Sequence, residues 1–205
     1  MTESRAGLNR LLQLLLAAAL LAGGAWLSTD GLRRRDDAQA KAGIAGVLGS
    51  QVYDNDLLRD HILVRDAAAL GTTDALPLWR ARQDGQPVAV VVDAIATQGY
   101  GGPIRLRIGI AHDGRVLGVR VIEHRETRGL GDAFERDGGR WLGALSGRSL
   151  QDTPPDRWRV RRDGGDFDQF AGATVTPRAI LARVQSVLAA YAEHGQQWFD
   201  EEVHD

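Results

Sequence analysis

The clearest pattern in the sequence is an alternation of apolar and polar residues near the middle of the chain. From Ile104 to Ile110 every second residue is isoleucine or leucine, and the residues between them are arginine or glycine. This period of two predicts a strand with one buried face. Asp113-Gly114 predicts a tight turn after it, and Val116–Ile122 predicts the partner strand of a hairpin. The β-branched run at Val88–Val92 predicts a further, buried strand.

Helical spacing appears at both ends of the region that follows the N-terminal segment. Near the C-terminus, apolar residues fall on one stripe of a helix: Ile180, Leu181, Val184, Val187, Leu188 and Tyr191. Thr176 is the expected N-cap, Pro177 suits the first turn, and Gly195 is the expected stop. Asp36–Leu48 predicts a second helix, which ends at Gly49. These elements predict an α+β fold, a mainly antiparallel sheet with packed helices.

The N-terminal segment Leu11–Leu27 is apolar except for Gln13. Its length lies at the short end of what crosses a bilayer, and we expect a retained transmembrane anchor. A cleaved signal peptide, which would release a secreted protein, is the alternative. Arg33-Arg34-Arg35 follow too closely for a usual cleavage region. Because arginines flank the segment on both sides, charge alone does not determine its orientation.

Composition excludes several classes of function. The chain has 205 residues, 25 basic and 27 acidic, with a formal net charge of −2. Such a balance provides no strong field for nucleic acid, and we expect no nucleic-acid partner. The absence of cysteine excludes thiolate catalysis, disulfides and iron–sulfur ligation. The five histidines are scattered, so we expect no metal site, and no catalytic triad pattern is present.

The stretch from Gly165 to Pro177 is the best candidate for chemistry. Its small residues Ala171-Gly172-Ala173 allow close approach of the backbone, and the stretch leads directly into the predicted helix. A helix N-terminus favours an anion such as phosphate, and Thr174 places a hydroxyl there. The alternative interpretation of these residues is an ordinary loop that caps the helix.

The run Asp163–Ile180 closely resembles the flavinylation region of the G subunits of the Rnf (or Rsx) electron-transport complex. In that family, and in the related C subunits of the sodium-pumping NADH:quinone reductase, the FMN phosphate is esterified to the threonine of an Asp-x-x-(Ser/Thr)-Gly-Ala-Thr motif. The matching residues here are Asp168, Gly172, Ala173 and Thr174, while Ala171 departs from the motif. The resemblance therefore implies covalent FMN on Thr174.

Three further blocks, in the order of the family, extend the resemblance over almost the whole chain. They are Tyr53–Asp56, Gly99–Ile104 and Glu126–Gly131, the last with Arg128 in place of a proline. The resemblance implies that Glu126 and Thr127 contact the flavin, and we also count Thr176 as a cofactor contact. Gly129 and Gly131 would bring backbone N–H groups near the flavin, and Leu130 would pack on its ring. A simple glycine-rich turn is the alternative for this loop.

The resemblance also implies a role, partners and a location. The chain would be an electron-transfer subunit of a bacterial inner-membrane complex that couples electron transfer between ferredoxin and NAD to ion translocation. Its partners would be the A, B, C, D and E subunits of the Rnf complex, membrane lipid around the anchor, and a flavin transferase that uses FAD. The flavin domain would be periplasmic. The expected segments are a cytoplasmic N-terminus (1–10), the anchor (11–30), a membrane-proximal helix or linker (31–50), the FMN-binding domain (51–195) and a tail (196–205).

Two other functions remain open at this point. The first is the C subunit of a sodium-pumping NADH:quinone reductase, which would use similar loops. The second is a membrane-anchored assembly or binding module that has the same fold without covalent flavin.

Overall fold

The computed structural model describes residues 35–136 and 138–201. The chain divides into two compact units, Met1–Ala42 and Gly43–Asp205, and the contacts described below lie within the second. Residues 35–45 are helical and residues 46–50 form turns, so the helix predicted for Asp36–Leu48 is confirmed through residue 45. The predicted anchor at Leu11–Leu27 lies outside the described residues. Within the described ranges, no helix has the length and apolar character needed to span a bilayer.

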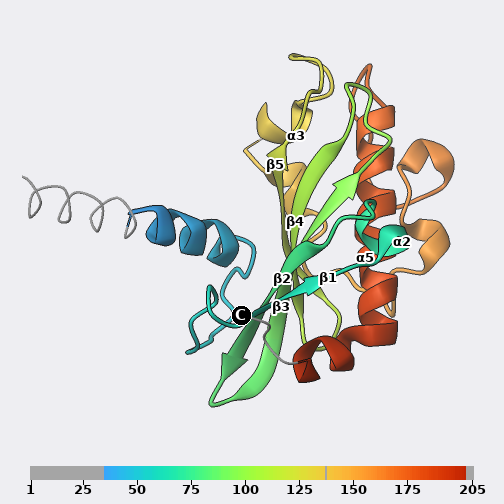
Figure 1. Ribbon diagram of the computed structural model, residues 1–205. Helices are drawn as coiled ribbons and strands as arrows, with labels where there is room; N and C mark the ends of the chain where they lie inside the picture. The colour runs from blue at the N-terminus through green and yellow to red at the C-terminus, as the bar shows by residue number, and fades with distance from the viewer. Residues whose placement is uncertain (1–34, 137, 202–205) are drawn as a thin grey trace, which may run out of the picture. The chain divides into compact units, whose positions relative to one another are not determined.

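A five-stranded sheet forms the centre of the second unit (Figure 1). Its strands lie in the order of the sequence, each antiparallel to the next. They are β1 (His61–Val64), β2 (Leu76–Gln83), β3 (Gln86–Ala96), β4 (Ile104–Ala111) and β5 (Val116–Glu123). The strands predicted over 88–92, 104–110 and 116–122 are confirmed as parts of β3, β4 and β5. β1 and β2 were not identified from the sequence.

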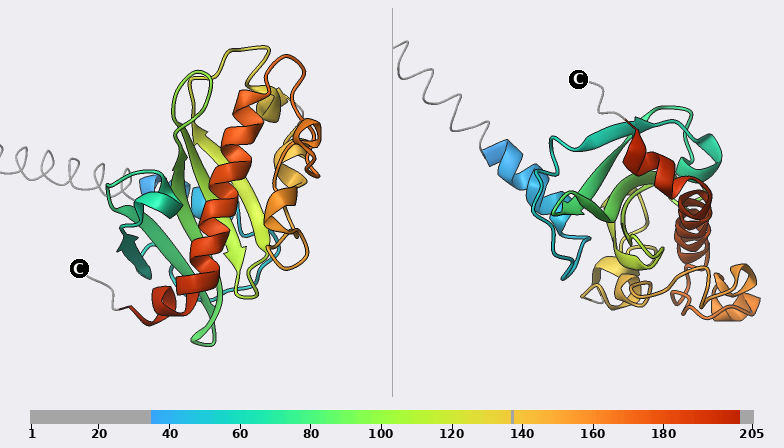
Figure 2. Two further views of the ribbon diagram at one scale, coloured as in Figure 1. Left: turned by 90° about the vertical axis from the view of Figure 1, so that its right-hand side faces the viewer. Right: turned by 90° about the horizontal axis from the view of Figure 1, so that it is seen from below.

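Helix α5 (Val175–Asp200) crosses one face of the sheet, as both views in Figure 2 show. The alternating side chains of β4 meet it: Ile104, Leu106, Ile108 and Ile110 are fully buried in one core with the stripe of α5. The α+β class and the C-terminal helix are therefore confirmed. The remaining elements are short: α2 (Ala67–Leu70), α3 (Ala133–Arg136), α4 (Arg140–Gly143) and two 3-10 turns, Pro155–Arg157 and Arg161–Asp163.

Both predicted ends of the C-terminal helix were wrong. Its N-cap is Thr174, and Thr176 lies fully buried in the first turn. The helix also continues past Gly195, because the following turn buries Trp198 and Phe199. The ring of Tyr191 occupies the space that a Cβ at Gly195 would need, with ring atoms at 2.9–3.1 Å. Figure 1 shows the last part of α5 turning away from its earlier direction, a change that glycine permits.

The opposite face of the sheet is partly covered by the segment that precedes β1. Ile44, Val47 and Leu48 pack there against β2 and β3. The carbonyl of Val47 lies where a Cβ would stand on Gly109 and on Gly118, which are paired across β4 and β5. Glycine in these strands therefore permits a close backbone crossing.

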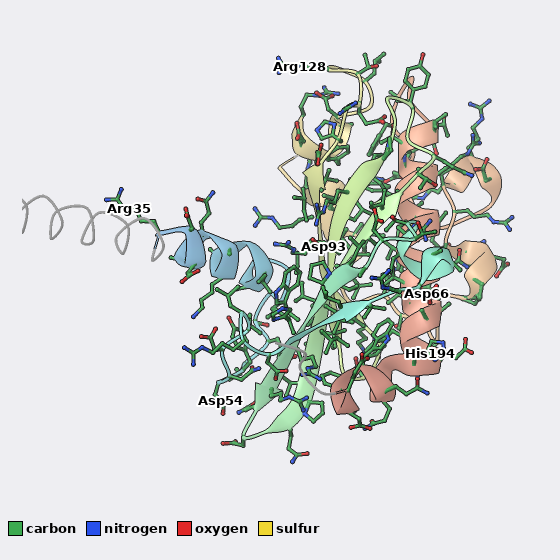
Figure 3. All side chains as sticks on the ribbon, viewed as in Figure 1. Arg35, Asp54, Asp66, Asp93, Arg128 and His194 are labelled. Carbon is green, nitrogen blue, oxygen red and sulfur yellow. The ribbon has the colours of Figure 1, made fainter. Side chains whose placement is uncertain are left out.

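A buried carboxylate lies further along this face. Asp93 of β3, labelled in Figure 3, has no exposed area. It accepts hydrogen bonds from Arg107 at 2.7 and 3.0 Å and from Arg105 at 3.1 Å, both on β4. The Arg107 guanidinium also lies 4.5 Å from the ring centre of Trp79. Asp93 thus serves as the shared acidic partner of the two arginines at the polar positions of β4.

Candidate functional site

Three loops and the first turn of α5 enclose a pocket of about 420 Å³. The loops are the β3–β4 connection, the segment after β5, and the segment before α5. Volume and mixed lining are typical of small-ligand sites. The residues that line the pocket are Tyr100, Glu126, Thr127, Leu130, Gly131, Gly172, Ala173, Thr174, Val175 and Arg178. The structure therefore brings together two blocks that are about forty residues apart in the sequence and that the resemblance had assigned to one site.

Glu126 holds these loops together. Its side chain is buried, and its Oε1 accepts a hydrogen bond of 2.9 Å from the backbone N–H of Gly101. Its Oε2 accepts a hydrogen bond from the hydroxyl of Thr176 in α5. One carboxylate therefore joins the β3–β4 loop to the helix, and it explains why Thr176 is buried rather than capping the helix.

Glycines allow the loops to approach closely at this point. A Cβ on Gly131 would lie 2.6 Å from Oε2 of Glu126 and 3.1 Å from the hydroxyl of Thr176. Gly172 has a φ of +76°, which favours glycine, and a Cβ there would lie 3.3 Å from Leu130. The small residues predicted for the site therefore allow the loops to pack closely and also leave space in the pocket.

Thr174 stands at the N-terminus of α5, a helix of 26 residues. Its side chain is half-buried, lines the pocket and makes no capping hydrogen bond. The unpaired N–H groups and the helix dipole at this end favour a negatively charged group. The geometry thus places a threonine in the wall of the pocket, at a position suited to phosphate.

Three of the predicted contacts do not line the pocket. Asp168 is exposed and forms an ion pair of 2.9 Å with Arg161. Gly129 has a φ of +85°, and its N–H donates to Asp132 at 2.9 Å. Thr176 lies behind Glu126, as described above. Asp168 and Gly129 thus make contacts within their own segments, outside the pocket.

Three residues that line the pocket were missed. Tyr100 and Val175 are among the large apolar side chains that remain exposed, at 73% and 41%. Arg178 follows Thr174 by four residues, so helical spacing places it on the same face one turn later. Tyr100 lies inside a block that resembled the family, but no spacing rule marked its side chain.

Arg178 forms a two-pronged ion pair with Asp163, which lies in the loop before α5. Its Nε and Nη2 donate to the two carboxylate oxygens, each at 2.6 Å. The Arg178 guanidinium holds the pKa of Asp163 below its ordinary value, and Asp163 raises the pKa of Arg178. Both groups are therefore charged at neutral pH, and the guanidinium has a defined orientation at the pocket.

Comparison with known proteins identifies the family of the chain. The family described as "FMN-binding domain" matches residues 99–189, which contain every residue that lines the pocket. The chain is similar to the G subunit of the ion-translocating oxidoreductase complex of Shewanella amazonensis, with 44% identity over 154 residues, 75% of this chain and 72% of that one. The G subunits of Vibrio atlanticus and Shewanella loihica are 39% and 37% identical, over 83% and 89% of this chain and 81% and 86% of theirs. The chain therefore belongs to the family of ion-translocating oxidoreductase complex G subunits and contains an FMN-binding domain.

Proposed function

We propose that this chain is a covalently flavinylated electron carrier, with the phosphate of FMN esterified to Thr174. The observation that carries the proposal is the position of Thr174, which lines the pocket at the start of α5 and makes no capping hydrogen bond. The residues fit the group. Apolar side chains from three segments (Tyr100, Leu130 and Val175) offer surface for a ring system, and the helix end suits its phosphate.

Attachment follows from ordinary phosphoryl-transfer chemistry. With FAD as donor, the Thr174 oxygen would form a bond to the phosphorus on the riboflavin side, and the bond to the bridging oxygen would break. AMP would leave, and the hydroxyl proton would be lost. A separate flavin transferase would catalyse this step. The isoalloxazine ring would stay unmodified, and FMN would supply the redox chemistry.

The wider role follows from the family and from the resemblance. We propose that the chain passes electrons within a bacterial inner-membrane complex that couples transfer between ferredoxin and NAD to ion translocation. The A, B, C, D and E subunits would be its partners. The segment 11–30 would anchor it, with the flavin domain on the periplasmic side. The names of the relatives support a multi-subunit oxidoreductase.

Intact-mass analysis of the denatured chain tests the covalent link. Co-expression with a flavin transferase should add the mass of FMN minus water, mapped to a peptide that contains Thr174. Thr174→Val should abolish the gain without weakening α5, because the side chain makes no capping bond. Ser186→Ala is the matched control, since Ser186 lies on the same helix, does not line the pocket and should leave the gain intact. An unmodified wild-type chain, with a transferase that modifies a control acceptor, would favour an assembly module without covalent flavin.

A further inference from the structure

Arg178 is the basic side chain of the FMN pocket. Among the described residues that line the pocket, Glu126 and Arg178 are the ones that carry charge. Arg178 lies one helical turn after Thr174, and it also lines a neighbouring hollow with Asp163 and Arg159. The guanidinium thus stands at the border of the pocket, on the same helix as the hydroxyl that would carry the phosphate.

The pairing with Asp163 orients Arg178 without using all its hydrogen-bond donors. A guanidinium has five N–H donors in a planar fork. Asp163 takes one from Nε and one from Nη2. The structure assigns no partner to Nη1 among the described residues, so this edge remains for a second anion. Arginine binds phosphate in this way, through paired, charge-assisted hydrogen bonds.

Glu126 determines which part of the pocket suits a phosphate. Its carboxylate is buried, and both oxygens already accept hydrogen bonds from the protein. An anionic phosphate near Glu126 would meet a like charge in a poorly solvated place, which is unfavourable. The end of the pocket with Thr174 and Arg178 offers instead a helix N-terminus and a cation.

We propose that Arg178 recognises the phosphate of the flavin nucleotide and thereby makes the pocket select FMN over riboflavin, with Asp163 as the residue that positions Arg178. This inference rests on the proposed function for the identity of the ligand, but it does not require the ester to form. It assigns to this arginine a role in non-covalent recognition before attachment and in holding the phosphodiester afterwards.

The first test measures free flavins against the full chain carrying Thr174→Val, which cannot form the ester. FMN and riboflavin share the ring and differ in the phosphate, so the ratio of their dissociation constants isolates the phosphate contact. Arg178→Gln should weaken FMN binding by about tenfold or more, as expected for a hydrogen bond between charged groups, and should leave riboflavin binding within about twofold. Arg178→Lys should keep part of the preference. Arg120→Gln is the matched control, since Arg120 is an exposed arginine of β5 and does not line the pocket.

The second test uses the chain with Thr174 intact. Arg178→Gln should slow flavinylation by the transferase, and in flavinylated protein it should shift the ³¹P resonance of the phosphodiester. Arg120→Gln should change neither. An unchanged FMN-to-riboflavin ratio would overturn the inference. If free flavins bind too weakly to measure, an unchanged flavinylation rate together with an unshifted ³¹P resonance would overturn it.

The two proposals fail in different ways. If the wild-type chain is flavinylated and Arg178→Gln changes no readout, the function stands and the role of Arg178 falls. If FMN preference depends on Arg178 but no mass is gained on Thr174, the recognition site stands and the covalent carrier falls.

Discussion

Arg80 holds the C-terminal end of α5 against the sheet, and replacing it tests how much that contact stabilises the fold. Arg80 lies on β2 with only 3% of its side chain exposed. Its Nε donates to Asp60 at 2.5 Å, and its Nη1 donates to the backbone carbonyls of Trp198, Phe199 and Glu201 at 3.3, 3.3 and 2.5 Å. A cation at the carbonyl end of a helix is also favoured by the helix dipole.

The expected cost of Arg80→Met is a lowering of the free energy of unfolding by about 2–4 kcal/mol. Removing one partner of a buried ion pair typically costs about 3–5 kcal/mol. Three remaining hydrogen bonds reduce that figure here: Asp60 still accepts from Arg82 and Asn55, and the Phe199 carbonyl still accepts from Arg82. Methionine also removes the cost of burying a guanidinium, so the expected destabilisation lies below about 5 kcal/mol.

Urea unfolding of the full chain in mild detergent, followed by tryptophan fluorescence, measures this change. Arg59→Met is the control, because the Arg59 side chain is 89% exposed and lies 4.0 Å from its carboxylate partner. That variant should stay within about 0.5 kcal/mol of the wild type. An equally small effect for Arg80→Met would contradict this expectation and would mean that apolar packing alone holds the helix end.

Two further changes probe the loops and the long helix. Gly101→Ala would place a Cβ well under 3.0 Å from the backbone carbonyl of Arg125, so the loop with Glu126 must move. We expect about 1–3 kcal/mol of destabilisation in thermal unfolding, and slower flavinylation. Gly143→Ala is the control: a Cβ there would meet nothing within 4 Å, so neither stability nor flavinylation should change. Burial raises the pKa of Tyr191 from 10.0 to about 12, with Asp113 as the second cause. The folded chain therefore holds this proton more tightly, and stability present below pH 10 should be lost as pH rises from 10 to 12. Tyr191→Phe should remove that part of the pH dependence; an unchanged profile would contradict it.

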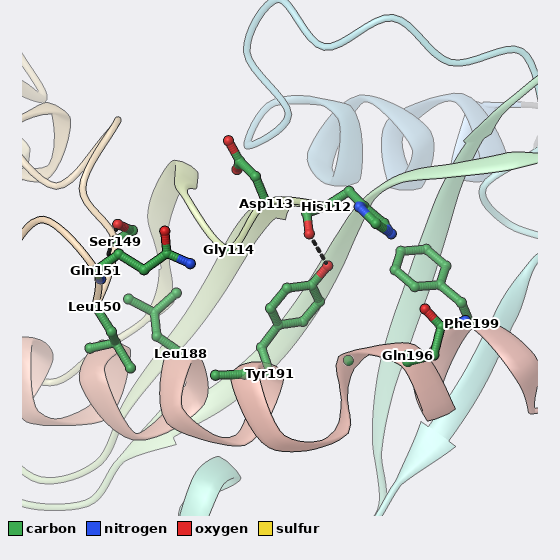
Figure 4. Close-up of a pocket in the computed structure, with 12 residues that line it drawn as sticks. His112, Asp113, Gly114, Ser149, Leu150, Gln151, Leu188, Tyr191, Gln196 and Phe199 are labelled. Carbon is green, nitrogen blue, oxygen red and sulfur yellow. Dashed lines mark hydrogen bonds between the residues drawn. The ribbon is translucent and has the colours of Figure 1, made fainter.

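Tyr191 lines a second pocket, nearer the C-terminal end of α5, and its surroundings explain the raised pKa. The Tyr191 hydroxyl donates to the carbonyl of His112 at 3.3 Å, as Figure 4 shows. Its ring lies against Gly195, where the helix lacks a side chain. Ionisation of this phenol would therefore place a charge in a confined site that holds a backbone acceptor.

Local periodicity in the sequence was enough to predict β3, β4, β5 and the stripe of α5. In each case burial repeats at the period of the element, so neighbouring residues carry the information. β2 escaped prediction because its sequence mixes proline, tryptophan and arginine with apolar residues, and β1 because it has only four residues. Those arginines are tolerated only because Asp60 and the end of α5, distant in sequence, supply partners.

The candidate site divides in the same way. The motif around Thr174 and the loop at Glu126 both resembled the family as short runs, and a phosphate site at a helix end is itself a local arrangement. Contacts across the fold bring the two segments to one pocket and link Glu126 to Gly101 and Thr176. They also place Tyr100 and Arg178 in the lining of that pocket. Local sequence was therefore enough for β3, β4, β5, the long helix and the candidate motif around Thr174. The side chains that surround Thr174 depend on the fold, because hydrogen bonds and packing between distant segments leave no periodic trace in the chain.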